Sequence, residues 1–274
     1  MKKISIFIFL IILSSSMQLR GQISNQAFFY SATYTPDSTD VNNKGTDYMI
    51  LWAGDYYSVF ESYYGYQLDS VQAAASKQSN SPKDLNMTAL VGSVLSMKKP
   101  ALKFRIHKSW ADEQITVYQN IFFDNYVYIQ PLKMEGWNIE DQYKEILGFK
   151  CQKASIHYAG RDFIAWYSEE IPLSDGPYVF NGLPGLIMQI EDVQNFYSFE
   201  LIGIQSSSIK MSERVLPKTI SLSKNQFFLT KNALFKDVRK ALLGKPSSSV
   251  SDEAIRSVQQ RYDKSNNPLE LVVD

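Results

Sequence analysis

Apolar and polar residues alternate along much of the chain with the period of two that half-buried strands show. In residues 102–107, three apolar residues alternate with Lys103, Arg105 and His107. We therefore expect this basic face of the strand, His107 included, to point toward water. The pattern continues over residues 115–132, where an Asp-Asn pair supplies a turn between two strand-like stretches. Consecutive hairpins of this kind predict an antiparallel meander.

Further strands are predicted on both sides of this meander. An aromatic stretch at residues 48–66 is interrupted at Gly54 and again at Gly65, which is typical of a hairpin. Residues 69–97 lack clear alternation, and the sequence leaves their structure open apart from a short helical turn at residues 71–75. The remaining predicted strands cover residues 26–34, 149–158, 163–167, 186–190 and 196–204.

Two helices are predicted near the C-terminus. Ser223 and Gln226 have the spacing of a capping box, and apolar residues recur at helical spacing from Phe227 until Gly244 ends the pattern. A weaker amphipathic helix is predicted at residues 251–262. We find no repeat and no clear linker, so we expect a single domain of α+β class. Its architecture would be a curved antiparallel β-sheet, like a half-barrel, with the C-terminal helices against one side.

The first 21 residues have the three parts of a secretory signal peptide. Two lysines precede an apolar run at residues 4–13, and a serine-rich stretch ends at Gly21. The run is shorter than the roughly 20 residues that cross a bilayer, so we expect cleavage before Gln22, with an uncleaved signal anchor as the alternative. After cleavage of residues 1–21, the mature domain would comprise residues 22–274 and would contain no transmembrane segment.

The composition argues against several classes of protein. The 28 basic and 28 acidic residues balance, which gives no electrostatic basis for binding nucleic acid. One cysteine cannot form an internal disulfide framework, and Cys151 is expected to be buried, with pairing to a second chain as the alternative. Cys151 also lies far from the cleavage position. We therefore predict an exported periplasmic or outer-envelope protein that is not a lipoprotein.

The most informative stretch, residues 171–187, contains two sets of turn-forming residues. One turn is indicated by the tripeptide Asp-Gly-Pro at residues 175–177. In the other, Pro184 would fix φ at one corner and Gly185 would take the positive φ of a type II turn. The apolar neighbours are expected to anchor this second turn to the core. Its hexapeptide consists of Gly182, Leu183, Pro184, Gly185, Leu186 and Ile187.

This hexapeptide reads GLPGLI, and the chain resembles the GLPGLI family of exported proteins from Bacteroidetes. The resemblance extends to residues 148–154, 160–161, 165–167, 171–172, 176–177 and 266–271. It implies export and, for some members, genes near those of outer-membrane receptors of the TonB-dependent type. The family has no established biochemical activity, so the resemblance assigns no catalytic residue.

Each candidate binding residue has a structural and a functional interpretation. The hexapeptide either sets the direction of a strand or offers a docking surface for a peptide or partner strand. Arg161 could bind a carboxylate or phosphate, or it could pair with an acid at position 162, 169 or 170 or stack on an aromatic ring. Trp166 belongs either to the core or to a ligand platform. In each case the structural interpretation is favoured.

An enzymatic role finds little support in the sequence. A cysteine hydrolase would need Cys151 beside a histidine. His157 would lie about 20 Å from Cys151 along one strand, which leaves only a cross-strand meeting with His107. The sequence contains no short metal-ligand spacing and no phosphate-binding glycine loop. We therefore expect no metal, no cofactor and no catalytic residue.

Three functional hypotheses follow from these patterns. The leading one is a non-enzymatic cell-envelope protein whose concave, aromatic-rich sheet binds an apolar ligand, a lipid or an extended peptide. The alternative is an accessory module that docks on an outer-membrane receptor, and the third is an envelope enzyme using Cys151. A large apolar groove would favour the first hypothesis, and an exposed apolar patch near Gly182 would favour the second.

Overall fold

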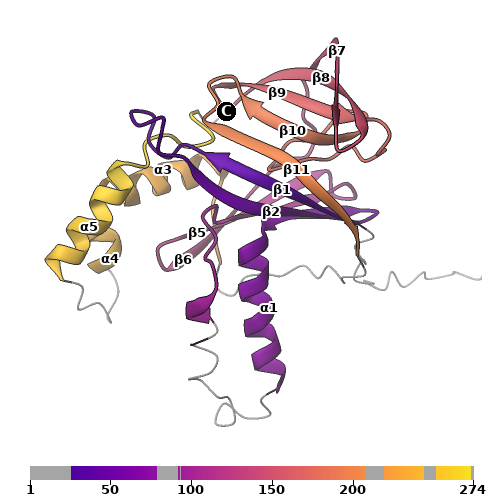
Figure 1. Cartoon of the computed structure of the whole chain (residues 1–274). Coiled ribbons are helices and arrows are strands. Elements are labelled where there is room, and N and C mark those ends of the chain that lie inside the picture. Colours follow the sequence, from indigo (N-terminus) through magenta and orange to yellow (C-terminus); the bar gives the residue numbers. More distant parts are fainter. Residues whose placement is uncertain (1–25, 79–91, 93, 208–218, 244–250, 273–274) are drawn as a thin grey trace, which may run out of the picture.

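The computed structural model describes residues 26–78, 92, 94–207, 219–243 and 251–272. The predicted signal peptide at residues 1–21 lies outside the described residues. Within the described ranges, no helix is both long enough and apolar enough to cross a membrane. The described chain forms a twelve-stranded sheet that curls around an aromatic core, and helices lie at one side of it (Figure 1). The predicted α+β class and curved sheet are confirmed.

The strands, in chain order, are β1 (Gln26–Tyr34), β2 (Gly45–Ala53), β3 (Tyr57–Ser62), β4 (Phe104–Ser109), β5 (Gln114–Ile121), β6 (Asp124–Pro131), β7 (Asn138–Ile146), β8 (Phe149–Tyr158), β9 (Arg161–Ser168), β10 (Leu186–Asp192), β11 (Tyr197–Ser206) and β12 (Thr219–Ser221). The helices are α1 (Tyr63–Gln78), α3 (Lys224–Lys236), α4 (Val238–Leu243) and α5 (Asp252–Asp263).

The first strand, β1, lies in the middle of the sheet. The spatial order is β12-β6-β5-β4-β3-β2-β1-β11-β10-β9-β8-β7, and every described pair is antiparallel except β12 with β6. Strands β1 to β6 form one meander and β7 to β11 form another. The two meanders join where β1 pairs with β11 along its whole length, from Gln26 opposite Ser206 to Tyr34 opposite Tyr197.

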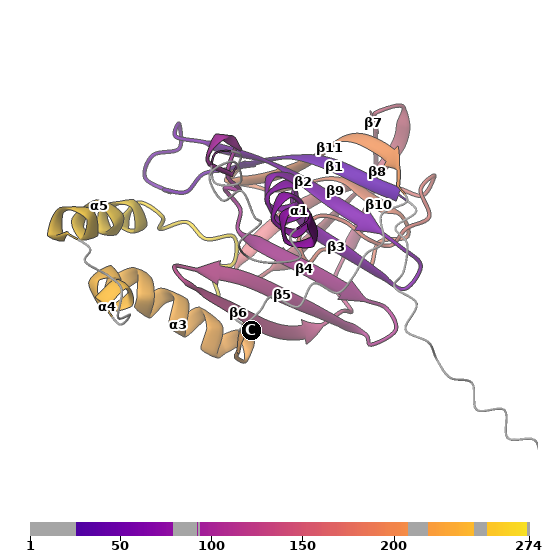
Figure 2. The ribbon, with the colours of Figure 1, turned by 90° about the horizontal axis from the view of Figure 1, so that it is seen from below.

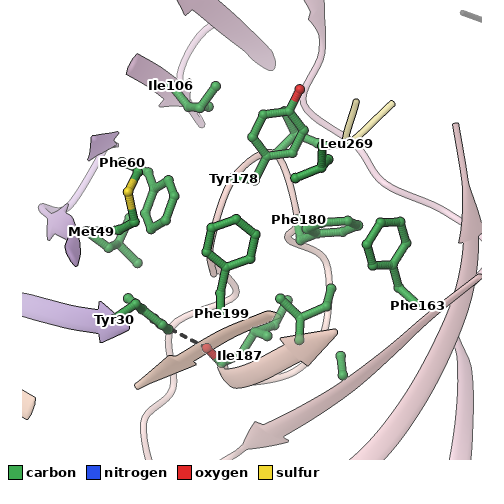
Figure 3. Close-up of a cluster of buried hydrophobic side chains, with 14 of the residues drawn as sticks. Tyr30, Met49, Phe60, Ile106, Phe163, Tyr178, Phe180, Ile187, Phe199 and Leu269 are labelled. Carbon is green, nitrogen blue, oxygen red and sulfur yellow. Dashed lines mark hydrogen bonds between the residues drawn. The ribbon is translucent and has the colours of Figure 1, made fainter. Parts of the chain in front are cut away.

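The core lies inside the curl of the sheet, and part of it is formed by a loop of the chain itself. The connection between β9 and β10 runs through the interior, and its residues Tyr178, Val179 and Phe180 are buried. Figure 3 shows Tyr178 and Phe180 among side chains from strands of both meanders, such as Phe60 and Phe199. The sheet therefore wraps around a segment of its own chain.

The central strands are buried on both faces. Ala27, Ile50, Trp52 and Val59 form a second cluster on the outer face of the sheet, where the start of α1 covers them. The rings of Trp52 and Tyr66 lie 4.9 Å apart at this contact. Beyond its first turns α1 projects away from the sheet (Figure 1).

The C-terminal helices lie beside the end of the sheet formed by β5 and β6 (Figure 2). Phe227 of α3 packs on the ring of Tyr128 in β6, with 4.9 Å between the centroids. The predicted capping box is confirmed, because Ser223 and Gln226 exchange side-chain to backbone hydrogen bonds. The predicted helix is divided at Asp237 into α3 and α4.

The predicted water-facing set around β4 is correct for Lys103, which is exposed just before the strand, and wrong for Arg105 and His107. Arg105 is buried and forms an ion pair with Glu61, 2.7 Å away, and a second one with Asp69 of α1. His107 is mostly buried against the ring of Tyr118. Both faces of β4 are covered, since α1 and neighbouring side chains lie over the face that the alternation assigned to water.

Three further differences concern the extent of the elements. The aromatic stretch that was expected to continue as strand to residue 66 enters α1 at Tyr63. Strand β7 lies in a charged segment, and β12 has three residues, so neither showed an apolar alternation. The positive φ expected at Gly185 occurs instead at Gly182, where φ is 93°.

Candidate ligand-binding site

The GLPGLI hexapeptide, residues 182–187, directs most of its side chains into the core. Leu183, Leu186 and Ile187 are buried, while Gly182 and Pro184 are exposed. The Tyr30 hydroxyl donates a hydrogen bond to the Ile187 carbonyl oxygen over 2.9 Å (Figure 3). Strand β10, which begins within the hexapeptide, pairs with β9 and β11. The apolar residues of the hexapeptide therefore stabilise the interior instead of forming an exposed patch.

Gly185 occupies a position where the backbone of a neighbouring strand leaves no room for a side chain. A Cβ atom at Gly185 would lie 2.1 Å from the Ser168 carbonyl oxygen, which is far inside van der Waals contact. The glycine is thus required by a close approach of two backbones.

A buried ion pair holds the interior segment to the sheet. The Lys108 ammonium group of β4 donates hydrogen bonds to the Asp175 carboxylate (2.5 Å), the Gly176 carbonyl oxygen (2.7 Å) and the Phe180 carbonyl oxygen (3.0 Å). Burial lowers the pKa of Lys108, and the adjacent Asp175 opposes this effect. All three ammonium protons are used, so this lysine is a structural group.

Arg161 is also engaged by the protein itself. Its guanidinium group pairs with Asp192 at 3.2 Å, and both side chains are 1% exposed. It also donates hydrogen bonds to the Leu269 carbonyl oxygen at 3.1 Å and the Pro268 carbonyl oxygen at 2.7 Å. The pairing acid is Asp192 and not one of those named from the sequence. The guanidinium group also lies over the rings of Phe196 and Tyr197, 5.6 and 5.4 Å from their centroids, which is the aromatic contact that the sequence offered as the other structural interpretation. Arg161 ties the C-terminal segment to the sheet.

Trp166 and Cys151 lie apart from the cavity described below. The Lys144 ammonium group lies over the half-buried Trp166 ring, 4.4 Å from its centroid. Cys151 is a free, buried thiol, and burial raises its pKa to about 11. Its hydrogen bond goes to the Phe149 carbonyl oxygen at 3.5 Å.

The two histidines are placed separately from Cys151. His107 lies on β4, whereas Cys151 lies on β8, and β3, β2, β1, β11, β10 and β9 come between these strands in the sheet order. His157 pairs with Asp162 at 2.7 Å on the surface. Among the described residues, no group of three or more His, Cys, Asp or Glu side chains has the geometry to hold a metal ion.

A cavity of about 890 Å³ opens between the sheet and the C-terminal helices. Its lining residues come from β4 and β5, from α3 and α5, from residues 99–103 before β4, and from the segment that follows α5. The lining is rich in aromatic and aliphatic side chains, among them Leu102, Phe104, Phe122, Phe228, Phe235 and Tyr262. This volume lies within the range of small-molecule binding sites.

A buried polar cluster lies at the wall of this cavity. The Glu270 carboxylate accepts hydrogen bonds from the hydroxyls of Tyr178 (2.5 Å) and Tyr158 (3.3 Å), and Lys224 lies 3.0 Å from its other oxygen. Burial and the neighbouring Glu270 raise the pKa of Tyr178 well above its ordinary value. Glu270 therefore orients two tyrosines and forms an ion pair with Lys224, while its Oε2 atom accepts no hydrogen bond from the described residues.

Lys231 of α3 is a cation in the cavity lining that has no ion-pair partner among the described residues. Its ammonium group lies 5.7 Å from the centroid of Phe228 and 5.9 Å from that of Phe235. Within the described parts of the chain it forms neither a hydrogen bond nor an ion pair. Burial lowers its pKa, and the more distant Glu270 opposes that effect.

The sequence predictions did not include this cavity. Its lining residues are as far apart in the sequence as Tyr34 and Glu270. A local sequence pattern does not predict that such distant residues lie close together in the fold. The one available signal was the C-terminal stretch 266–271, which the family resemblance included and which contributes Leu269 and Glu270 to the wall.

Comparison with known proteins connects the chain to a family without a known role. Residues 159–189 match a sequence family described as "Protein of unknown function (Porph_ging)". This stretch includes Arg161, Trp166 and the hexapeptide. No curated protein sequence matches the chain significantly.

Two solved structures of PNGF-II, in different crystal forms, are similar to the chain in fold. The first has a TM-score of 0.50 at 8% sequence identity and matches 75% of this chain and 32% of that chain. The second has a TM-score of 0.49 at 9% identity and matches 77% of this chain and 32% of that chain. The chain thus corresponds to about a third of the length of PNGF-II, and at this identity the likeness concerns the fold alone.

Proposed function

We propose that this chain is an exported binding protein of the cell envelope that holds a small apolar or amphipathic molecule between its sheet and the helices α3 and α5. The observation that carries the proposal is the cavity of about 890 Å³ with its aromatic lining. A cavity of this size with apolar walls and a few oriented polar groups is the usual form of a small-molecule site. Glu270, Tyr178 and Lys231 supply those polar groups.

The location of the cavity differs from the one first expected. The curl of the sheet is filled by Tyr178, Phe180 and their neighbours, so that surface is occupied by the protein itself. The proposed site lies instead beside β4 and β5, where side chains of α3, α5 and the segment after α5 complete the lining. An apolar ligand remains the leading hypothesis, with this different site.

Export and membership of the GLPGLI family are part of the proposal. Export is supported by the signal-like pattern of residues 1–21, and family membership by the intact hexapeptide at residues 182–187. The mass of the protein recovered from the envelope of its host tests export, because cleavage would remove residues 1–21. Burial of Leu183 and Ile187 disfavours receptor docking through the hexapeptide.

Binding of the neutral apolar dye N-phenyl-naphthylamine tests the site. We expect one dye molecule per chain and an increase in dye fluorescence. Leu102→Trp replaces an aliphatic side chain in the cavity lining by a bulky indole ring and should weaken dye binding by about tenfold, the equivalent of about 1.4 kcal/mol. Leu229→Trp is the matched control, because Leu229 is 65% exposed on α3 and does not line the cavity. Equal dye affinity in the two variants would contradict the proposal.

A further inference from the structure

The proposed function leaves the class of ligand open, and the charges around the cavity narrow it. Among the described residues, the lining contains five basic side chains and one acidic side chain, Glu270. Lys231 is half-buried, and the other four, Lys99, Lys103, Arg261 and Lys264, are exposed. A cleft lined mainly by one sign of charge concentrates ligands of the opposite sign, because its low-dielectric walls focus the field. The lining thus favours an anionic ligand.

The single acid does not neutralise this set of cations. Glu270 already pairs with Lys224 at 3.0 Å and accepts two tyrosine hydroxyls. Its charge is therefore matched by a lysine that is not part of the cavity lining. Lys264 lies near Asp37 and contributes to the low pKa of that carboxyl. The charge of Lys264 is therefore partly balanced by Asp37. Lys231 remains as a basic group inside the site without an anionic partner in contact.

The position of Lys231 indicates where the charged group of a ligand would bind. Its ammonium group lies over two phenylalanine rings, at 5.7 and 5.9 Å from their centroids. A desolvated cation over an aromatic face is stabilised, but this contact satisfies none of its hydrogen-bond donors. A ligand that places an anionic oxygen at Lys231 would supply that acceptor, while its apolar part would lie against the aromatic walls.

We propose that the cavity binds a single-chain amphiphile whose anionic head group, a carboxylate or a phosphate, contacts the Lys231 ammonium group while its apolar chain packs along Phe104, Phe122 and Phe235. This inference rests on the proposed function and adds to it the charge of the ligand and the residue that recognises it. A cationic ligand is disfavoured, because Glu270 is already partnered and the remaining charges in the lining are positive.

Displacement of the neutral dye by three matched amphiphiles tests the inference. Hexadecanoate and hexadecyl phosphate carry an anionic head group, and hexadecanol has the same chain without a charge. We expect an anionic amphiphile to displace the dye at a concentration at least about tenfold lower than hexadecanol, since hydrogen bonds to charged groups are the stronger ones. Preference for one of the two anions identifies the head group as carboxylate or phosphate.

Substitution of Lys231 provides the second arm. Lys231→Met keeps the unbranched chain and removes the charge, so anionic amphiphiles should bind about ten- to a hundredfold more weakly while hexadecanol and the dye are unaffected. Lys231→Arg should retain the preference for anions. Lys236→Met is the control, because Lys236 is an exposed lysine on the same helix that does not line the cavity.

The outcomes separate the two proposals. Equal affinities for hexadecanol and hexadecanoate, or an unchanged preference for anions in Lys231→Met, would overturn the assignment of an anionic ligand and leave the binding function standing. If the dye and all three amphiphiles failed to bind the unmodified protein, the proposed function itself would be overturned.

Discussion

The ammonium group of Lys108 lies 2.5 Å from the carboxylate of Asp175, and neither side chain is exposed to solvent. The two residues come from β4 and from the interior connection between β9 and β10, which are far apart in the sequence. This ion pair fixes the interior segment, and with it Tyr178, whose hydroxyl contacts Glu270 at the wall of the cavity. The core and the proposed binding site are thus connected through one short segment.

Removal of one partner of this pair should destabilise the protein strongly. Lys108→Met leaves the Asp175 carboxylate buried without its counter-ion, and we expect a loss of about 3–5 kcal/mol in the free energy of unfolding, measured by urea denaturation. Lys108→Met combined with Asp175→Asn removes both charges and should recover part of the loss. Lys133→Met, which breaks an exposed pair with Glu135, is the control and should change nothing measurable. A small effect of Lys108→Met would show that the pair is dispensable.

Gly185→Ala should also be destabilising. The new methyl group would lie 2.1 Å from the Ser168 carbonyl oxygen, so two backbone segments must separate, and a cost of about 2 kcal/mol or more is expected. Gly203→Ala is the matched control, since no atom lies within 4 Å of the added carbon. Thermal unfolding of both variants measures the difference. Equal melting temperatures would mean that the turn adjusts freely.

His107 should make the protein less stable in acid. Burial lowers the pKa of His107 from 6.5 to about 4, so the unfolded chain binds a proton between these values that the folded chain does not. Stability is therefore lost as the pH falls from 6.5 to 4, by about 3 kcal/mol in total. In His107→Phe this loss of stability between pH 6.5 and 4 should disappear. Urea unfolding at several pH values in this range measures it.

Arg161→Lys should release the C-terminal segment. A lysine cannot reproduce the hydrogen bonds to Leu269, Pro268 and Asp192 at once, because it lacks the planar fork of donors. We expect faster amide exchange over residues 266–271 by mass spectrometry. Because Leu269 and Glu270 line the cavity, dye affinity should fall as well. Unchanged exchange in this segment would contradict the role assigned to Arg161.

Cys151 should be chemically inert in the folded protein. A thiol with a pKa of about 11 is almost entirely protonated at pH 8, and the protonated form is a poor nucleophile. We expect iodoacetamide to modify Cys151 only after denaturation, as followed by intact mass. Rapid modification of the native protein would revive the hypothesis of an enzyme that uses Cys151, and Cys151→Ser would then be the decisive variant in any activity assay.

Much of the sheet was predictable because its strands carry a local signal. The apolar alternation around Ile106 and the hairpin break at Gly54 both report the conformation of a few neighbouring residues, and both matched the structure. Helix α1 was not predictable in the same way. Its residues show little amphipathic pattern because most of its length projects away from the sheet.

The candidate site was not predictable, because its chemistry depends on long-range contacts. Lys108 shares a strand face with the apolar residues Phe104 and Ile106, but a lysine at such a position ordinarily marks the solvent-exposed end of a strand. Only the structure shows that Asp175 lies opposite Lys108. Lys231 and Glu270 likewise belong to separate segments. No local sequence pattern indicates that both line the same cavity.

The central position of β1 has a consequence for the order in which the chain can fold. Strands β1 to β6 can form their meander from local hairpins, but β1 then presents an unpaired edge. Its partner β11 begins at Tyr197, so the edge that starts at Gln26 stays open until this late segment of the chain is in place. Contacts of such high sequence separation slow folding, and an open apolar edge is prone to aggregation. We therefore expect truncation before β11 to give an insoluble product even though ten of the twelve strands of the described sheet, β1 to β10, would be present.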